Sequence, residues 1–305
     1  MENREIMPFD GWLNKRIIAF AAIVLGTVLV NISFFEQMLE FSRRNNFSSH
    51  VLAIPFVSAA LLFYRRSVIF QNINLSVFAG GAVAAIGIFL LTGFTFGNTG
   101  LSQSDLLSAK ALAVVIIWIG AFLLLFGLES SRKAIFALLF LLFMVPIPEF
   151  LLEPVIVGLQ MGSADMTAFL FKITGTTHFR EGVIFMLPGI TIEVARECSG
   201  IRSSLALLIT CLLAGHLMLQ TTWRKWVFIA FAVPMAMFKN AIRILVLSLL
   251  AIHIDTRFMT ESSLHRDGGI LFYLLSLVLM LPILAILRRS EQKSGRRIDK
   301  SRFES

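Results

Sequence analysis

The chain has 305 residues, of which 57% are hydrophobic and only 15% are charged, and its mean hydropathy is +0.81. These values exclude an ordinary soluble domain and indicate that the protein is folded in a bilayer. The formal net charge of +8 comes from short basic clusters between and after apolar runs. Because no aromatic-interleaved basic patch is present, the charge indicates membrane topology and not nucleic-acid binding.

Apolar runs of about 20 residues, the length that crosses a bilayer, recur along the whole chain. We expect about eight transmembrane helices, near residues 17–35, 50–64, 75–94, 109–128, 134–150, 201–220, 226–250 and 269–287. The second and fifth runs are the shortest. The first run follows basic residues but is not followed by a small-residue cleavage site, which indicates a retained span and not a signal peptide.

The distribution of Lys and Arg predicts the orientation of these spans. The loops expected on the inner side contain Arg65 and Arg66, Arg132 and Lys133, Arg224 and Lys225, and the tail from Arg288 to Arg302. The loop at 95–108 has no Lys or Arg, whereas Arg43 and Arg44 lie on the expected outer side and oppose this orientation. On balance we expect a multi-pass protein of the inner (plasma) membrane, with both termini cytoplasmic and residues 289–305 as a basic cytoplasmic tail.

The segment of about 50 residues between the fifth and sixth expected spans is interrupted by charged residues, so we place it outside the membrane or at its interface. Within it, VIFML and ITIEV flank Pro188-Gly189. Such β-rich runs around a turn pair predict a short extracytoplasmic β-hairpin over 182–193, before the sixth span. The hairpin is either a structural lid or an edge that docks an extended peptide. The expected fold class is therefore an all-α polytopic membrane protein with one small hairpin.

Cys198 lies just before an apolar helix, between Arg196 and Arg202. The positive end of a helix dipole and nearby cations both favour the thiolate, which is the nucleophilic form. A small buried cysteine is the alternative, and Cys211, inside an apolar span, fits that description. The two cysteines form no CxxC pair and no His/Cys cluster, so we expect neither a metal site nor a cofactor.

Arg243 lies in the second half of the seventh expected span, after Lys239 and Asn240. An arginine inside a membrane span is costly unless it is paired or lines a wet cavity, so Arg243 is a candidate functional residue or a structural interhelical donor. Asn240 is three residues earlier and shares its helix face, which allows the amide to orient the guanidinium.

His265 precedes the last span, on the expected extracytoplasmic side. An imidazole near a thiol can activate it and later protonate a leaving amine. Under one topology, a thiol, a guanidinium and an imidazole from three segments all fall at the outer membrane surface. The chemistry would use Cys198 as nucleophile, His265 as acid and base, and Arg243 as a charge donor.

These residues resemble the motifs of the exosortase/archaeosortase family of multipass membrane cysteine transpeptidases. The matching stretches are VPIPEF at 145–150, REGVIFMLPGITIEVARECSGIRSS at 180–204, KNAIRI at 239–244 and LHRDGG at 264–269. The core of the resemblance covers 145–288 of a single domain that spans 1–305. It implies that Cys198, Arg243 and His265 are the catalytic residues. The supporting residues would be Ser199, Gly200, Arg202 and Asn240.

The resemblance also implies the substrates and partners. They would be exported proteins with a C-terminal sorting signal (PEP-CTERM-like) made of a short motif, a transmembrane helix and a basic cluster. The resemblance implies that the signal is cut next to the motif and that the product is passed to a cell-surface acceptor, either exopolysaccharide-linked or lipid-linked. Family members often have His-Asp where this chain has His265-Arg266-Asp267, which leaves a role for Asp267 open.

Two other functions fit the same residues. The first is a membrane cysteine endopeptidase in which water takes the acyl group, because hydrolysis and transfer need the same thioacyl intermediate. The second is a multipass transporter or channel that binds an anion at Arg243 and Lys239. The transporter leaves the placement of Cys198 and His265 at one surface unexplained.

Overall fold

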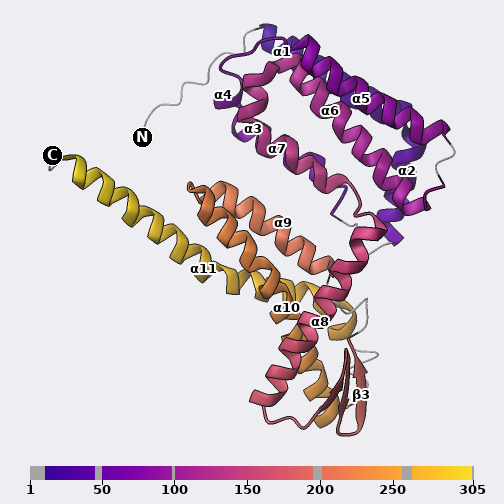
Figure 1. Ribbon diagram of the computed structural model, residues 1–305, viewed down its shortest axis with the longest axis vertical. Coiled ribbons are helices and arrows are strands. Elements are labelled where there is room, and N and C mark those ends of the chain that lie inside the picture. Colours follow the sequence, from indigo (N-terminus) through magenta and orange to yellow (C-terminus); the bar gives the residue numbers. More distant parts are fainter. Residues whose placement is uncertain (1–10, 45–49, 98–99, 195–200, 256–262, 304–305) are drawn as a thin grey trace. The chain divides into compact units, whose positions relative to one another are not determined.

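The computed structural model describes residues 11–44, 50–97, 100–194, 201–255 and 263–303, and most of them are helical (Figure 1). The described chain forms two compact units, residues 1–151 and 152–305. Helix α8 runs from the end of the first unit into the second.

The first unit is entirely helical in its described part. Its elements are α1 (Gly11–Val30), α2 (Ile32–Arg44), α3 (Ile54–Tyr64), α4 (Arg66–Ile69), α5 (Val77–Phe96), α6 (Gln103–Lys133), α7 (Ile135–Phe140) and the 3-10 helix η2 (Leu141–Met144). Helices α5 and α6 make its closest pair. Gly80 and Gly120 allow this approach, because a Cβ on either glycine would overlap backbone atoms of the facing helix. Small residues at such a contact are typical of helix pairs in membranes, where close packing replaces the hydrophobic effect.

The second unit combines four long helices with a small sheet. Its elements are α8 (Glu149–Ile173), β1 (Phe179–Glu181), β2 (Ile184–Leu187), β3 (Ile190–Glu193), α9 (Ile201–Met218), α10 (Thr222–His253) and α11 (Ser263–Phe303). Helices α9, α10 and α11 pack against one another around a core that includes Leu207, Cys211 and Phe228. Since α9 and α10 are joined by a short turn, they are antiparallel, and α11 runs parallel to α9.

The sheet is antiparallel, with the strand order β1-β2-β3. The β2–β3 hairpin turns at Pro188 and Gly189, and Gly189 has a φ of +80°, which a glycine adopts without strain. One face of the sheet packs into a second core. This core joins Phe171 of α8 and Ile244 of α10 to the buried strand residues Phe185, Leu187 and Ile192 and to Val194. The predicted hairpin is therefore confirmed, and β1 adds a strand that was not expected.

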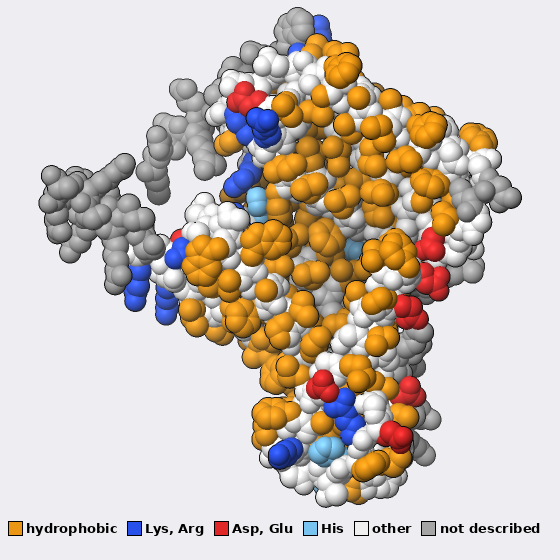
Figure 2. All heavy atoms as spheres, in the orientation of Figure 1, with side chains coloured by type: hydrophobic (Ala, Val, Ile, Leu, Met, Phe, Trp, Pro, Cys, Tyr) orange, Lys and Arg blue, Asp and Glu red, His pale blue; other side chains and the backbone are white. Residues whose placement is uncertain are grey.

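Seven of the described helices are long and apolar enough to cross a membrane: residues 13–30, 77–96, 103–133, 149–173, 201–218, 222–253 and 269–293. Apolar side chains cover much of the visible surface over these helices, and charged side chains gather in small groups (Figure 2). The all-α polytopic fold class is thus confirmed.

Two expected spans are shorter in the structure than a membrane crossing requires. Residues 50–64 and 134–150 contain only short apolar helices, Ile54–Tyr64 and Ile135–Met144. Arg65 and Arg66 follow the first, and Pro146 and Pro148 follow the second, where a helix cannot continue without losing backbone hydrogen bonds.

The expectation that the segment of about 50 residues between 150 and 201 contains no span was wrong, because α8 is a continuous 25-residue helix that is long and apolar enough to cross a membrane. Two of its charged residues, Glu149 and Lys172, lie in its first and last turns. Asp165 is paired with Arg180 of β1 at 2.8 Å, which lowers the cost of a carboxylate in this helix. The hairpin consequently precedes the fifth, and not the sixth, of the spans found in the described residues.

Candidate active site

One end of the α9–α10–α11 bundle collects the segments that carry the candidate residues. The opposite end is identified by Glu291 of α11, which accepts hydrogen bonds from the backbone N–H groups of Gln220 and Thr221 in the α9–α10 turn. The end away from this turn therefore contains the start of α9, the second half of α10 and the start of α11. We call it the α9-start end.

Two hydrogen bonds fix the register of the three helices. Lys239 of α10 donates to the hydroxyl of Ser203 in the first turn of α9. The hydroxyls of Thr210 in α9 and Tyr273 in α11 are 2.8 Å apart. The three helices are thus aligned at two levels, one at the start of α9 and one in its middle.

Arg243 lies beyond Lys239 toward the α9-start end. The two residues are one turn apart on the same face of α10, which corresponds to an axial rise of about 6 Å. Since Lys239 is level with Ser203, Arg243 is level with or beyond Ile201, the first residue of α9. The side chain of Arg243 is half-buried and interacts with other groups of the protein, so it is neither sealed in the core nor fully exposed.

The backbone of residue 265 belongs to the first turn of α11. It precedes Tyr273 by eight residues, or about 12 Å along the axis. Since α11 is parallel to α9 and Tyr273 is level with Thr210, residue 265 is level with Arg202. The side chain of His265 lies outside the described part of the structure.

Cys198, Ser199 and Gly200 also lie outside the described residues. The described chain resumes at Ile201, three residues after Cys198. Arg202 is exposed and has a polar contact, as expected for a residue at a helix start. A contact among Cys198, Arg243 and His265 therefore remains a prediction, and the structure describes only the framework around it.

Three buried polar side chains in this region are uncommon in a membrane bundle. Lys239 is 2% exposed, Asn240 is 1% exposed and Ser163 of α8 is fully buried. The amide nitrogen of Asn240 and the hydroxyl of Ser163 have no hydrogen-bond partner among the described residues. Buried polar groups without hydrogen-bond partners are rare and destabilising. Their presence here makes this part of the bundle a candidate functional region.

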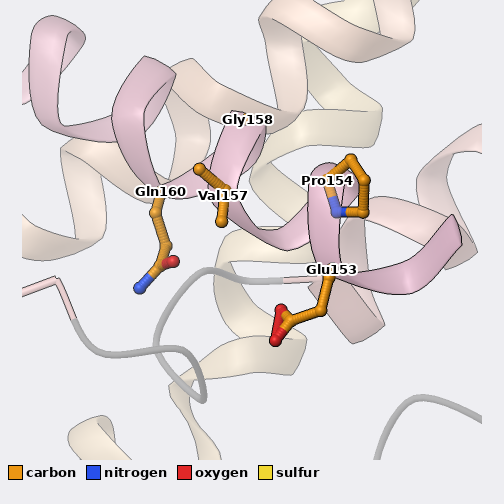
Figure 3. Close-up of a pocket in the computed structure, with 5 residues that line it drawn as sticks. All are labelled: Glu153, Pro154, Val157, Gly158 and Gln160. Atoms are coloured by element: carbon orange, nitrogen blue, oxygen red, sulfur yellow. The ribbon is translucent and has the colours of Figure 1, made fainter. Parts of the chain in front are cut away.

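A cavity of about 590 Å³ opens on α8 and is lined by Glu153, Pro154, Val157, Gly158 and Gln160 (Figure 3). The side chains of Glu153 and Gln160 both project from the helix in this view. The amide of Gln160 donates to the carbonyl of Val194 at 2.8 Å, which ties α8 to the chain just after β3. The cavity is therefore adjacent to the point at which the chain leaves the sheet toward Cys198.

Sequence reasoning did not identify Gln160 and Glu153, or the pairing of Ser203 with Lys239. Gln160 could have been noticed as an amide in the middle of a span, where polar residues are expensive. It was overlooked because the segment was not recognised as a span. The partner of Lys239 is not encoded in any local pattern, because it lies on another helix.

Family comparison gives the class of the protein. The family model for transmembrane exosortases matches residues 42–282. This match includes most of the first unit as well as the second, whereas the motifs noted in the sequence begin at residue 145. Curated proteins and solved structures give no match. The protein is thus a multipass membrane protein with a helical bundle and a small sheet, and it belongs to the transmembrane exosortase family.

Proposed function

We propose that the protein is a cysteine transpeptidase that cleaves a C-terminal sorting signal from exported proteins and passes them to an acceptor at the cell surface. Family membership supports a membrane protease or transpeptidase. The observation that carries the proposal is the register of α9, α10 and α11. It brings Arg243, the backbone of residue 265 and the helix start that follows Cys198 to one end of the bundle.

The proposed reaction begins with attack of the Cys198 thiolate on the carbonyl carbon of the scissile peptide bond. A thioester forms between the sulfur and the acyl group, the C–N bond breaks, and the protonated imidazole of His265 gives its proton to the leaving amine. The carbonyl oxygen carries negative charge in the tetrahedral intermediate, and the Arg243 guanidinium stabilises it. Asn240, one turn from Arg243 on the same helix, supplies a second buried donor.

An acceptor nucleophile then attacks the thioester, His265 takes its proton, and the thiolate of Cys198 leaves. If the acceptor is a surface or polysaccharide-linked group, the reaction is a transfer. If the acceptor is water, the protein is an endopeptidase. Mass spectrometry of the new C-terminus separates the two, because hydrolysis leaves a free carboxylate on every product.

The substrate we propose has its own transmembrane helix. A helix beside the bundle holds the adjoining extended segment at the membrane surface, so the scissile bond is presented at a fixed depth. When the helix binds beside the bundle, the scissile bond is thereby positioned for reaction. We place the site on the extracytoplasmic side of the inner membrane, because the exposed or half-buried Lys225, Arg288, Arg289 and Lys293 lie at the opposite end of the bundle, although Arg180 and Arg202 oppose this orientation.

The transporter alternative is less well supported by the described contacts. It requires Lys239 and Arg243 to hold an anion together. Lys239 instead is buried in the bundle and donates to Ser203, so its side chain does not face an open binding site in the described structure.

Replacement of each cysteine tests the proposal. Cys198→Ala should abolish processing, and uncut exported proteins with apolar C-terminal helices should accumulate in the membrane. Cys211→Ala is the matched control, because Cys211 is buried in the α9–α10–α11 core and away from the α9-start end. Proteomic comparison of membranes from the two strains measures the effect. Full processing by Cys198→Ala, or complete loss with Cys211→Ala, would contradict the assignment of the nucleophile.

A further inference from the structure

The outer edge of β3 has backbone groups that its own sheet does not use. Val194, the residue after β3, donates its N–H to the carbonyl of Val183 at 3.0 Å, on the side of β2. In an antiparallel ladder the N–H and C=O of successive residues point alternately to the two sides. The backbone groups of Glu193 and Thr191 therefore point away from β2.

The strand order places these groups at an edge of the sheet, because β3 pairs only with β2 in the described structure. Natural edge strands are usually blunted by short length, charge, proline, bulges or covering elements, and β3 has the first two of these features, with four residues and Glu193 at its end. β3 contains no proline, and its register with β2 is regular from Leu187↔Ile190 to Ile184↔Glu193. The edge is regular enough to accept another strand.

The two faces of β3 have different surroundings. Ile192 and Val194 are buried against α8 and α10, whereas Thr191 and Glu193 are exposed. The buried face of β3 packs against the core. At the other edge of the sheet, the salt bridge between Arg180 of β1 and Asp165 links the sheet to α8. A strand added at β3 would consequently pair with a template that is already ordered, which reduces the entropy lost on binding.

The position of β3 connects this edge to the proposed chemistry. Ile244, which follows Arg243, packs in the same buried cluster as Ile192 and Val194. Cys198 follows Val194 by four residues in the sequence. A peptide running along β3 would therefore be guided toward the chain segment that carries the nucleophile and toward the helix face that carries Arg243.

We propose that the outer edge of β3 binds the extended segment of the exported substrate as a fourth strand, so that main-chain hydrogen bonds to Thr191 and Glu193 hold the substrate near its scissile bond. This inference rests on the proposed function and specifies its binding surface. Recognition by strand addition uses the substrate backbone for affinity and leaves alternate side chains to determine specificity. The sheet is then a docking element and not only a lid.

Cysteine cross-linking tests the geometry without requiring catalysis. In a full-length protein carrying Cys198→Ala and Cys211→Ala, Glu193→Cys provides the single thiol. The probe is an exported protein that accumulates uncut in the Cys198→Ala strain, with one cysteine moved through its extended segment. Directly opposed residues of paired strands have Cβ atoms about 4.5–5.5 Å apart, which permits a disulfide. We expect cross-links at every second substrate position.

Glu181→Cys in the same background is the matched control, because Glu181 is exposed on β1 at the opposite edge of the sheet. It should give no periodic cross-links. Cross-links that favour Glu181→Cys, or that show no period of two at Glu193→Cys, would overturn the proposal. The result is independent of the nucleophile test, since the proposed function fails only if Cys198→Ala still processes its substrates.

A kinetic comparison separates backbone from side chain. Among the hydrogen-bonding groups of the backbone, Glu193→Pro removes only the outward N–H, and proline is tolerated at an edge position of this kind; it also removes the carboxylate, for which Glu193→Gln is the control. We expect KM for the same substrate to rise by about fivefold, as for loss of one hydrogen bond, with kcat little changed. Glu193→Gln retains the N–H and should show a smaller rise. An equal rise in both variants would contradict pairing through the backbone.

Discussion

The contact between Lys239 and Ser203 aligns α10 with the start of α9, and it involves a buried ammonium. Ser203→Ala removes the hydroxyl that accepts this hydrogen bond. The ammonium of Lys239 then stays buried, and the free-energy cost of its desolvation is no longer offset by that bond. We expect a loss in the free energy of unfolding of about 1–3 kcal/mol. Lys239→Met combined with Ser203→Ala should be less destabilising than Ser203→Ala alone, because both polar partners are then replaced. Denaturation midpoints of the detergent-purified variants measure the difference, and a double variant that is the less stable of the two would contradict the assignment.

Arg243 is expected to act through the shape of its side chain as well as its charge. The guanidinium presents a planar fork of donors, whereas an ammonium is a point charge with different reach. Arg243→Lys should therefore lower the rate of substrate processing nearly as much as Arg243→Met. Pulse-chase measurement of precursor cleavage gives the two rates. Retention of most activity in Arg243→Lys would show that charge alone is sufficient. It would contradict the proposal that the guanidinium stabilises the oxyanion through its fork of donors.

At the residue scale, the sequence identified side chains whose chemistry is unusual for their surroundings. Arg243 and Asn240 were recognised because polar groups in a membrane span need an explanation, and the structure shows Asn240 to be fully buried. Their partners could not be inferred in the same way. Ser203 is one of several serines near a helix start, and only the helix register shows that it faces Lys239.

Among the elements, α5 and α6 depend on glycines that have no room for a side chain. A Cβ at Gly80 would lie 2.2 Å from the backbone nitrogen of Leu124, so the two helices would have to separate. We expect Gly80→Ala to destabilise the first unit by about 1–3 kcal/mol, as overpacked cores do. Gly81→Ala is the matched control, because no atom lies within 4 Å of a Cβ there. Thermal denaturation of the two variants tests this, and equal midpoints would mean that the helix pair adjusts freely.

The turn between α9 and α10 is held by one carboxylate. Glu291 accepts hydrogen bonds from the backbone N–H groups of Gln220 and Thr221 just before α10. Its negative charge also interacts favourably with the positive end of the helix dipole. Glu291→Ala should lower the denaturation midpoint clearly. Glu129→Ala is a suitable comparison, because Glu129 contacts only Asn72 and Lys133 at an exposed site among the described residues and should change the midpoint little. A larger effect at Glu129 would contradict this ranking.

At the scale of elements, the sequence predicted the hairpin well and the spans less well. The hairpin was recognisable because β-branched runs flank a Pro-Gly pair, and turn chemistry of this kind is local. Helix α8 was missed because its charges were counted without their positions. Asp165 is neutralised by Arg180, which is 15 residues away and on a strand. Such pairing depends on the tertiary structure and could not be read from the segment itself.

For the whole molecule, the positions of the basic residues predict the orientation of the C-terminal bundle. Exposed or half-buried Lys225, Arg288, Arg289 and Lys293 lie at the end of the α9–α10 turn, and the sheet packs on the other half of α10. From the positive-inside rule we therefore expect the turn to face the cytoplasm and the sheet to lie outside. For the N-terminus also to be cytoplasmic, the chain must cross the membrane an even number of times. Seven described helices are long enough, so one of the short apolar segments must contribute to a crossing.

Labelling with a membrane-impermeant maleimide tests this orientation in a background of Cys198→Ala and Cys211→Ala. Thr191→Cys, on the exposed face of β3, should react in intact cells, whereas Arg289→Cys should react only after permeabilisation. Lys15→Cys, in the first turn of the span at 13–30, should behave like Arg289→Cys, because the basic pair Lys15 and Arg16 predicts that this end of the span faces the cytoplasm. Reaction of Lys15→Cys in intact cells would show an odd number of crossings and two termini on opposite sides. Reaction of Arg289→Cys in intact cells would invert the bundle and place the proposed active site in the cytoplasm, where exported substrates could not be processed after export.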